Sequence, residues 1–136
     1  MKNSKYHIQY IDSGIFPATI MFIVGYSYKE VLCHLKKTKA EEWHCGIQGH
    51  EKLFNGKAFA IRTDIINTKG KEKTLFYIGF NDLFKFTDFD YIALAHECLH
   101  ICQYFLPDAL DRNKEHEAEA YLHSHLMKQC LEILRR

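Results

Sequence analysis

The sequence lacks both a long hydrophobic run and an excess of charge of either sign. Its longest apolar run covers only residues 18–24, whereas a helix needs about 20 apolar residues to cross a bilayer. There are 18 Lys and Arg against 17 Asp and Glu, which leaves a formal charge of +1. This balance gives no electrostatic reason for binding nucleic acid or a membrane surface. We therefore predict neither as a partner.

A secretion signal and a disulfide framework are missing as well. Residues 1–7 contain no apolar core of a signal peptide. The 5 cysteines are odd in number and follow no regular spacing, which is typical of free thiols in a reducing compartment. We therefore expect a cytoplasmic protein.

The sequence does contain enough apolar material for a core. With 136 residues, 47% hydrophobic and 14% aromatic, the chain is expected to form a single α+β domain over residues 1–136. Alternating or continuous β-prone runs predict four strands, at 6–11, 19–24, 58–65 and 74–80.

Local signals predict the connections between these strands. Ser27 and Glu30 have the spacing of a capping box and predict an amphipathic helix from residue 27 to about residue 39. The polar residues 67–73 predict a hairpin turn. Residues 41–56 include two His and a Cys, but their spacing matches no structural zinc pattern, so a loop or irregular strand is expected there.

The most informative stretch is residues 91–106, which are mostly apolar and carry His96-Glu97-Cys98-Leu99-His100 in their middle. On a helix, His96 and His100 lie one turn and about 40° apart, so both imidazoles can reach one metal ion. Glu97 lies about 100° round from His96, where its carboxylate can face a water beside the metal without being a ligand. The pattern predicts a zinc site with Glu97 as the general base of a peptidase.

The expected surroundings of this motif strengthen the prediction. Thr87 and Asp90 have the spacing of an N-terminal cap, and Pro107 predicts the helix end. Such an apolar run predicts a buried helix, where polar groups without partners cost about 1 to 3 kcal/mol each. A shared metal would provide those partners. The alternative is that these residues only happen to fall at this spacing.

A thiol enzyme that uses Cys98 or Cys102 with His100 is a second alternative. Both cysteines are expected on the buried side of the helix, without the positive surroundings that lower a thiol pKa. The two residues are therefore better explained as small core residues.

A catalytic zinc site needs three protein ligands, so one more must come from elsewhere in the chain. A third His ten residues after the first is ruled out, because Leu106 stands at that position. The segment 111–136 is expected to form an acidic helix that offers Glu115, Glu117 and Glu119. Helical spacing alone does not decide among these three.

The pair of motifs resembles a known family. His96-Glu97-Cys98-Leu99-His100 followed by Glu117-Ala118-Glu119-Ala120-Tyr121 is similar to the gluzincin metallopeptidases, and most of all to small single-domain proteins of the ImmA/IrrE type and their relatives from phages and mobile elements. This resemblance covers about the last 50 residues.

The resemblance implies a zincin-like fold, a small, mostly antiparallel sheet packed on an active-site helix and a C-terminal helix. It implies Zn²⁺ bound by His96, His100 and Glu117, with Glu97 as the base. The chain departs from the larger gluzincins at Tyr121, where they have an Asp that supports the first His. The alternative function is a zincin-fold protein that binds or regulates a partner without turnover.

The expected substrate is an intracellular protein or peptide. The predicted hairpin immediately precedes the motif helix, which would place a sheet edge beside the metal. An extended peptide can bind such an edge as an added strand, held by main-chain hydrogen bonds. This arrangement requires the edge to be open.

Overall fold

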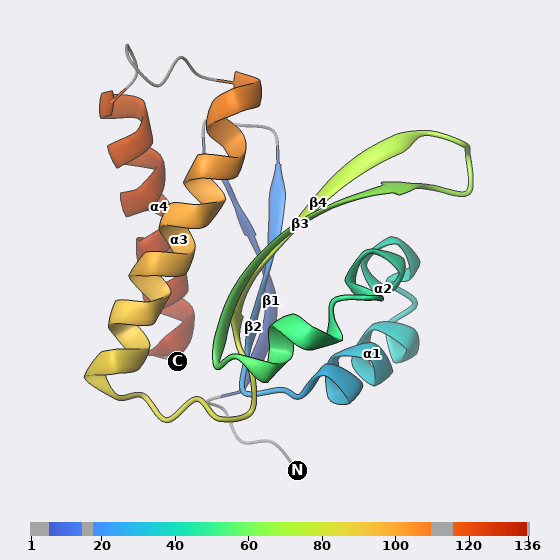
Figure 1. Ribbon diagram of the computed structural model, residues 1–136, viewed down its shortest axis with the longest axis horizontal. Coiled ribbons are helices and arrows are strands. Elements are labelled where there is room, and N and C mark those ends of the chain that lie inside the picture. Colours follow the sequence, from blue (N-terminus) through green and yellow to red (C-terminus); the bar gives the residue numbers. More distant parts are fainter. Residues whose placement is uncertain (1–5, 15–17, 110–115, 136) are drawn as a thin grey trace.

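A mixed four-stranded sheet forms the centre of the molecule (Figure 1). The computed structural model describes residues 6–14, 18–109 and 116–135, and their side chains except at 106–109, 116 and 117. The strands are β1 (His7–Asp12), β2 (Thr19–Val24), β3 (Ala58–Ile66) and β4 (Glu72–Phe80). They lie in the order β1-β2-β4-β3, so the described sheet has β1 and β3 at its edges.

All four predicted strands are present, and so is the hairpin between β3 and β4. Two strand pairs are antiparallel, while the central pair, β2 with β4, is parallel. The parallel pair arises because the chain leaves β2, passes through helices and β3, and returns in the same direction as β4. Gly79 permits this pairing, because a Cβ there would lie 1.8 Å from the main-chain oxygen of Ile23.

Helices cover both faces of the sheet. On one face lie α3 (Asp88–Ala109) and α4 (His116–Leu134), and on the other lie α1 (Tyr28–Lys37), α2 (Glu41–Ile47) and the short 3-10 helix η1 (Glu51–Asn55) (Figure 1). The five residues 20–24 of β2 are fully buried, because alternate side chains enter the two separate cores. The predicted burial of this strand on both faces is confirmed.

Residues 41–56 are helical, so the predicted loop or irregular strand is wrong. Packing on the sheet accounts for the helix α2, since Gly46 and Ile47 are buried against it. A Cβ at Gly46 would lie 2.5 Å from the hydroxyl of Tyr77, so the missing side chain lets α2 approach closely. The Tyr77 hydroxyl donates to the main-chain oxygen of Trp43 at 2.7 Å. These contacts come from tertiary structure, which local sequence does not encode.

The predicted cap of the motif helix is present and is linked to β3. The Asp90 N–H donates to Thr87 Oγ1 at 3.3 Å, and the Thr87 N–H donates to Asp90 Oδ2 at 3.2 Å. The other oxygen of the buried Asp90 carboxylate pairs with the ammonium of Lys57 at 2.6 Å. Because Lys57 directly precedes β3, this ion pair fixes the start of α3 to the start of that strand.

The helix α3 continues through Pro107 to Ala109, so the predicted end at the proline is wrong. A proline in a last helical turn removes one main-chain hydrogen bond, which a helix anchored along its length tolerates.

Although α3 has 22 residues, no helix in the described ranges combines the length and the apolarity needed to span a membrane.

Candidate metal centre

The two faces of α3 have different surroundings. One face is buried against the sheet and α4, and consists of Leu94, Cys98, Ile101, Cys102 and Phe105. His96 lies on the opposite face and is exposed, while Glu97 and His100 are half-buried. The expectation that the whole motif lies inside a buried helix is therefore wrong. The apolar run extends onto the outer face, and His96 and His100 of the motif lie on that face.

The imidazoles of His96 and His100 face each other. Their Nε2 atoms are 2.9 Å apart, and their ring centroids are 4.5 Å apart with perpendicular planes. Two nitrogen ligands at about 2.0–2.1 Å from a tetrahedral zinc ion lie about 3.3 Å from each other. The pair therefore fits one shared ion after a shift of a few tenths of an ångström.

Gln103 orients the ring of His100. Its Oε1 lies 3.2 Å from His100 Nδ1. An amide oxygen only accepts hydrogen bonds, so His100 donates from Nδ1 and its Nε2 keeps a lone pair for a metal. This role of Gln103 was not predicted from the sequence, and the signal for it is the i, i+3 spacing from His100.

Glu97 lies on the side of α3 that faces β3. Asp90, Glu97 and Tyr104 are seven residues apart and so share one stripe of the helix. Asp90 pairs with Lys57, and the Tyr104 hydroxyl donates to the main-chain oxygen of Ala60 at 3.5 Å. Because the residues on both sides of Glu97 in this stripe contact residues 57–60, Glu97 itself faces the first residues of β3.

The environment of Glu97 suits a general base. Burial raises the pKa of its carboxyl, and electrostatic interaction with His100 and His96 partly offsets this rise. A carboxylate with a raised pKa accepts a proton more readily near neutral pH.

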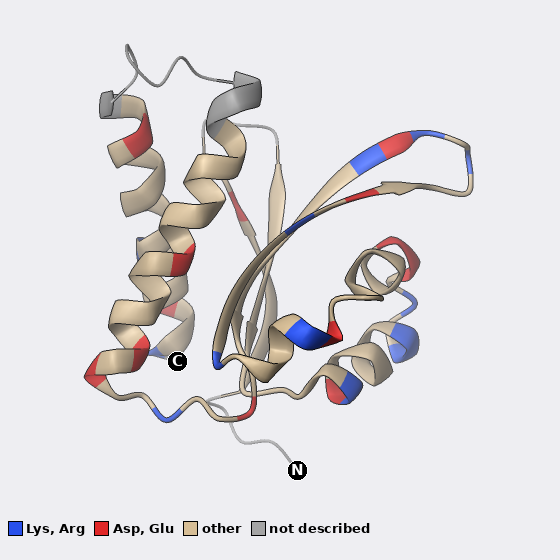
Figure 2. Cartoon of the chain, viewed as in Figure 1, with Lys and Arg blue, Asp and Glu red and all other residues tan. Residues whose placement is uncertain are grey.

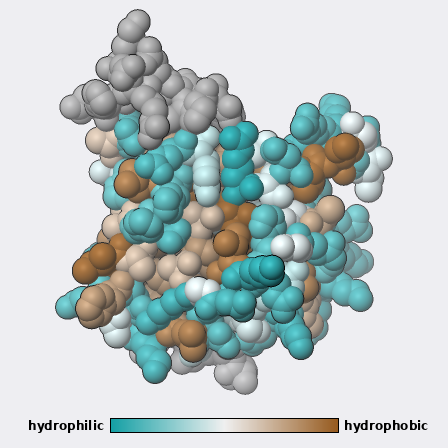
Figure 3. Space-filling view, in the orientation of Figure 1, coloured by the Kyte–Doolittle hydropathy of each residue, from teal (hydrophilic) through white to brown (hydrophobic). Residues whose placement is uncertain are grey.

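The outer edge of β3 has the geometry that strand addition requires. The Asn81 N–H donates to the Lys57 main-chain oxygen at 2.9 Å, so odd-numbered residues of β3 bond to β4. The N–H and C=O groups of the even-numbered residues 58–64 therefore point to the outer edge. No other strand in the described part of the chain pairs with this edge. Figure 3 shows apolar surface between α3 and β3 in the middle of this face.

The three glutamates proposed as third ligand have different positions. Glu115 and the side chain of Glu117 lie outside the described residues, although the main chain of Glu117 is in the first turn of α4. Glu119 is half-buried on the side of α4 that faces α3, close enough to Cys102 to raise the pKa of that thiol. Helical spacing places Cys102 about 160° round α3 from His100. Glu119 is therefore on the far side of α3 from the imidazole pair.

The helical stripe of α4 that contains Glu117 is not buried where it is described. Its other members, Ala120, Tyr121 and Ser124, are exposed. Tyr121 stacks on His125 at a centroid distance of 6.2 Å, so its ring contacts a histidine of its own helix. Among the side chains that the structure describes, no group of three His, Cys, Asp or Glu is placed to hold a metal ion.

Several residues near the motif have structural partners. His123 Nε2 donates to the main-chain oxygen of Ala95 at 3.0 Å, which joins α4 to α3 beside His96. His125 Nε2 lies 2.9 Å from Asp12 Oδ1 and joins α4 to the end of β1. Tyr104 contacts Ala60, while the side chain of His116 lies outside the described residues. These contacts give His123, His125 and Tyr104 structural roles.

The cysteines of α3 have none of the properties of catalytic thiols. Cys98 and Cys102 are fully buried. A hydrogen bond with Cys130 and burial raise the pKa of Cys98, and burial raises the pKa of Cys102 to about 12. Thiols with raised pKa values are poor nucleophiles near neutral pH.

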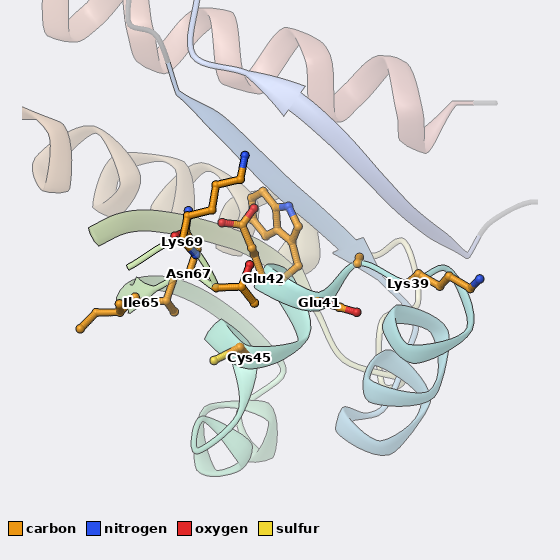
Figure 4. Close-up of a pocket in the computed structure, with 11 residues that line it drawn as sticks. Lys39, Glu41, Glu42, Cys45, Ile65, Asn67 and Lys69 are labelled. Atoms are coloured by element: carbon orange, nitrogen blue, oxygen red, sulfur yellow. The ribbon is translucent and has the colours of Figure 1, made fainter. Parts of the chain in front are cut away.

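A cavity of about 610 Å³ lies away from the imidazole pair (Figure 4). It is formed by the connection between α1 and α2, by α2 itself, and by the end of β3 with the β3–β4 turn. Its walls carry both signs of charge, including Lys39, Lys69, Glu41 and Glu42, and Glu42 pairs with Lys73 at 3.3 Å. No residue of the predicted metal site lines this cavity.

Comparison with known proteins gave no match for this chain among protein-family models, curated proteins or solved structures. The case for a function therefore depends on the residues themselves.

Proposed function

We propose that the protein is a zinc-dependent metallopeptidase in which His96, His100 and Glu117 hold the ion and Glu97 is the general base. The observation that carries this proposal is the 2.9 Å approach of the two imidazole Nε2 atoms. This approach occurs on the face of α3 that the core does not use. The hydrogen bond from His100 to Gln103 also supports it, because it leaves Nε2 available for a metal.

A bound zinc ion would lower the pKa of a water toward about 7 and polarise the carbonyl of a peptide bond. Glu97 accepts the proton of the attacking water and passes it to the leaving amine nitrogen as the C–N bond breaks. The raised pKa of the half-buried carboxyl suits both proton transfers.

We propose that the substrate is a protein or peptide that binds along the outer edge of β3. The main-chain groups of the even-numbered residues 58–64 point to that edge, where the Ala60 oxygen also accepts from the Tyr104 hydroxyl, and Glu97 faces its first residues. An extended chain in this position would present its carbonyl groups between β3 and the imidazole pair. Ala58 and Ala60 are small, so their side chains leave room on the side of α3.

The architecture agrees with a zincin-like fold, in which an edge strand and a second helix flank the motif helix. Here β3 lies on the Glu97 side of α3, and α4 lies on the other side. We propose a cytoplasmic location on the basis of the sequence, and the free cysteines are compatible with a reducing compartment.

Metal analysis of purified protein tests the proposal. We expect one zinc ion per chain in the wild type after reconstitution, and loss of zinc from His96→Ala, His100→Ala and Glu117→Ala. Glu119→Ala is the matched control and should keep its zinc, because Glu119 is on the far side of α3.

Each negative result would contradict a different part of the proposal. A wild-type protein that binds no zinc would rule out the metallopeptidase. Zinc retained by Glu117→Ala but lost from Glu119→Ala would move the third ligand to Glu119. A protein that binds zinc but cleaves no peptide would instead be the alternative, a binding or regulatory protein.

A further inference from the structure

The contact between Tyr104 and β3 differs from a second contact of the same kind. The Tyr104 hydroxyl donates to the main-chain oxygen of Ala60 at 3.5 Å, whereas the Tyr77 hydroxyl donates to that of Trp43 at 2.7 Å. Tyr77 is fully buried, while Tyr104 is half-buried. An O–H···O bond is usually about 2.7–2.8 Å long, so the bond of Tyr77 is strong and that of Tyr104 is weak. The Tyr104 hydroxyl can therefore exchange its partner with little loss of free energy.

This weak bond occupies a position that an added strand needs. The oxygen of Ala60 belongs to an even-numbered residue of β3 and points to the outer edge of the sheet. A peptide that adds to this edge donates main-chain N–H groups to such oxygens. Peptide binding therefore displaces the Tyr104 hydroxyl, which is then available to donate elsewhere.

Tyr104 and Glu97 lie on either side of His100 along α3. At about 1.5 Å per residue, Glu97 is about 4.5 Å before His100 and Tyr104 about 6 Å after it. The three residues lie within about 60° of one another round the helix. Because helical side chains lean toward the N-terminus of their helix, the ring of Tyr104 leans back toward the turn of His100. The displaced hydroxyl is therefore near His100, on the side opposite Glu97.

Peptide hydrolysis requires a donor at this place. When water attacks a peptide carbonyl, negative charge develops on the carbonyl oxygen, and a positioned hydrogen-bond donor stabilises it. The 22 residues of α3 include no Lys or Arg that could supply such a donor (Figure 2). Lys57, beside the first turn of the helix, is paired with the buried Asp90. The Tyr104 hydroxyl is the donor that α3 offers on the side facing β3.

We infer that Tyr104 is a catalytic residue that covers the Ala60 oxygen in the free protein and stabilises the oxyanion when a peptide is bound. In the added strand, the carbonyl groups that do not bond to β3 point away from it, and one of these is the scissile carbonyl. As the water oxygen bonds to its carbon, the π electrons move to the carbonyl oxygen. The Tyr104 hydroxyl donates a hydrogen bond to that oxygen and keeps its proton. This inference rests on the proposed function and adds a residue to its site.

The test compares Tyr104→Phe with the wild type and with Tyr91→Phe. The control removes a hydroxyl from the same helix, about 140° round from Tyr104. The substrate is a synthetic peptide chosen from a library because the zinc-loaded wild type cleaves it. Its phosphinic analogue, in which a P(O)(O⁻)–CH₂ unit replaces the scissile C(O)–NH unit, mimics the charge of the transition state.

The Tyr104→Phe variant should bind the peptide but hydrolyse it slowly. We expect kcat to fall by about 10²–10³-fold and the affinity for the phosphinic analogue to fall by about tenfold or more. Zinc content and unfolding temperature should match the wild type. In zinc-free protein, calorimetry should show that the variant binds the peptide at least as tightly as the wild type, because no hydroxyl competes for the Ala60 oxygen. Tyr91→Phe should match the wild type in every measurement.

The outcomes separate this inference from the proposed function. An unchanged kcat in Tyr104→Phe would overturn the inference. A lower kcat accompanied by an equal loss of peptide affinity in zinc-free protein, or by a lower unfolding temperature, would also overturn it, since a purely structural tyrosine has these effects. An active Tyr104→Phe beside an inactive Arg62→Gln would move the role to Arg62, which is two residues farther along β3. Absence of cleavage by zinc-loaded wild type would overturn the peptidase itself, and this inference with it.

Discussion

The helices α1 and α3 cover opposite faces of one sheet, yet only in α1 does every described feature contribute to the stability of the fold. Its Ser27 and Glu30 form a capping box, its last turn is basic, and Val31 and Leu35 anchor it in the core. Each of these features follows from general rules for helix stability. In α3 the cap and the core face follow the same rules, but the outer face does not.

The difference lies in what each helix presents to solvent. The outer residues of α1 are mostly charged or polar, and His34, Lys36 and Lys37 stand at its negative end. The outer face of α3 instead carries two facing imidazoles and exposed apolar side chains. Departures from folding rules of this kind occur mainly at functional sites. Four substitutions test the contrast, in order of decreasing effect.

Replacement of the proposed base should have the largest effect. We expect Glu97→Gln to lower peptide hydrolysis by about a hundredfold to ten-thousandfold and to leave zinc content unchanged. Burial raises the folded-state pKa of Glu97, so its ionisation weakens the fold as pH rises through that pKa. The variant should therefore be at least as stable as the wild type at pH 7, as urea unfolding would measure. Glu132→Gln, an exposed position on α4, is the control, and equal activity of both variants would refute the role of Glu97.

Loss of the Asp90 carboxylate should have the largest effect on stability. Asp90→Asn weakens the side-chain half of the capping box, where a neutral amide oxygen replaces a carboxylate, and leaves Lys57 without its anion, at a cost of about 2–4 kcal/mol of unfolding free energy. The exposed neighbour Asp88 provides the control, and Asp88→Asn should cost a few tenths of a kcal/mol to about 1 kcal/mol. Chemical denaturation curves measure both.

The contribution of Asp90 should also depend on pH. Burial alone would raise the pKa of this carboxyl, but hydrogen bonds from Lys57 and from the N–H groups of Lys85 and Thr87 hold it below its usual value. Its stabilising effect is therefore present above the unfolded-state pKa of about 3.9 and is lost as pH falls through the lower folded-state value. A wild type and an Asp90→Asn variant with parallel stability curves between pH 3 and pH 7 would contradict this.

Substitution of Gln103 should affect zinc affinity more than the stability of the fold. We expect Gln103→Leu to weaken zinc binding by about 10–100-fold, because His100 loses the acceptor that orients its ring. Gln103→Glu keeps an acceptor oxygen at this position and should bind zinc at least as tightly as the wild type. Competition with a fluorescent chelator measures both affinities, and identical values for the two variants would remove Gln103 from the site.

The smallest effect is expected on the opposite face of the sheet. Ser27→Ala removes the side chain that accepts from the Glu30 N–H, and should cost about 1 kcal/mol of unfolding free energy. Zinc affinity and peptide hydrolysis should not change, since α1 contributes no group to the site. A loss of either would mean that α1 is not purely structural.

The sequence predicts those parts of the fold that depend on local signals. The strand β1, the continuous apolar run of β2 and the caps at Ser27 and Thr87 are all present where they were expected. Residues 41–56 were mispredicted because α2 is stabilised by contacts with β4, and the glycine that permits this contact suggests a loop in isolation. Pro107 was misjudged for a similar reason, since tertiary contacts of α3 outweigh its local effect.

For the candidate site, helical spacing predicts which side chains lie together but not which way the helix faces. The approach of His96 and His100 follows from their i, i+4 spacing. The burial of the motif was overestimated, because an apolar run in the sequence does not show whether one of its helical faces is exposed to solvent. The identity of the third ligand depends on how α4 is placed against α3. The spacing of residues within one helix does not determine that placement.

The link between Lys57 and Asp90 has a thermodynamic consequence. It joins the first turn of α3 to the beginning of an edge strand, and Tyr104 makes a second link at Ala60. A peptide that adds to β3 would therefore immobilise both the strand and the helix that carries the imidazoles. Since a ligand that binds only the folded state stabilises it by mass action, substrate capture would raise the melting temperature of the protein. Thermal shift in a screen of candidate peptides would then detect substrates even with a chain that cannot cleave them.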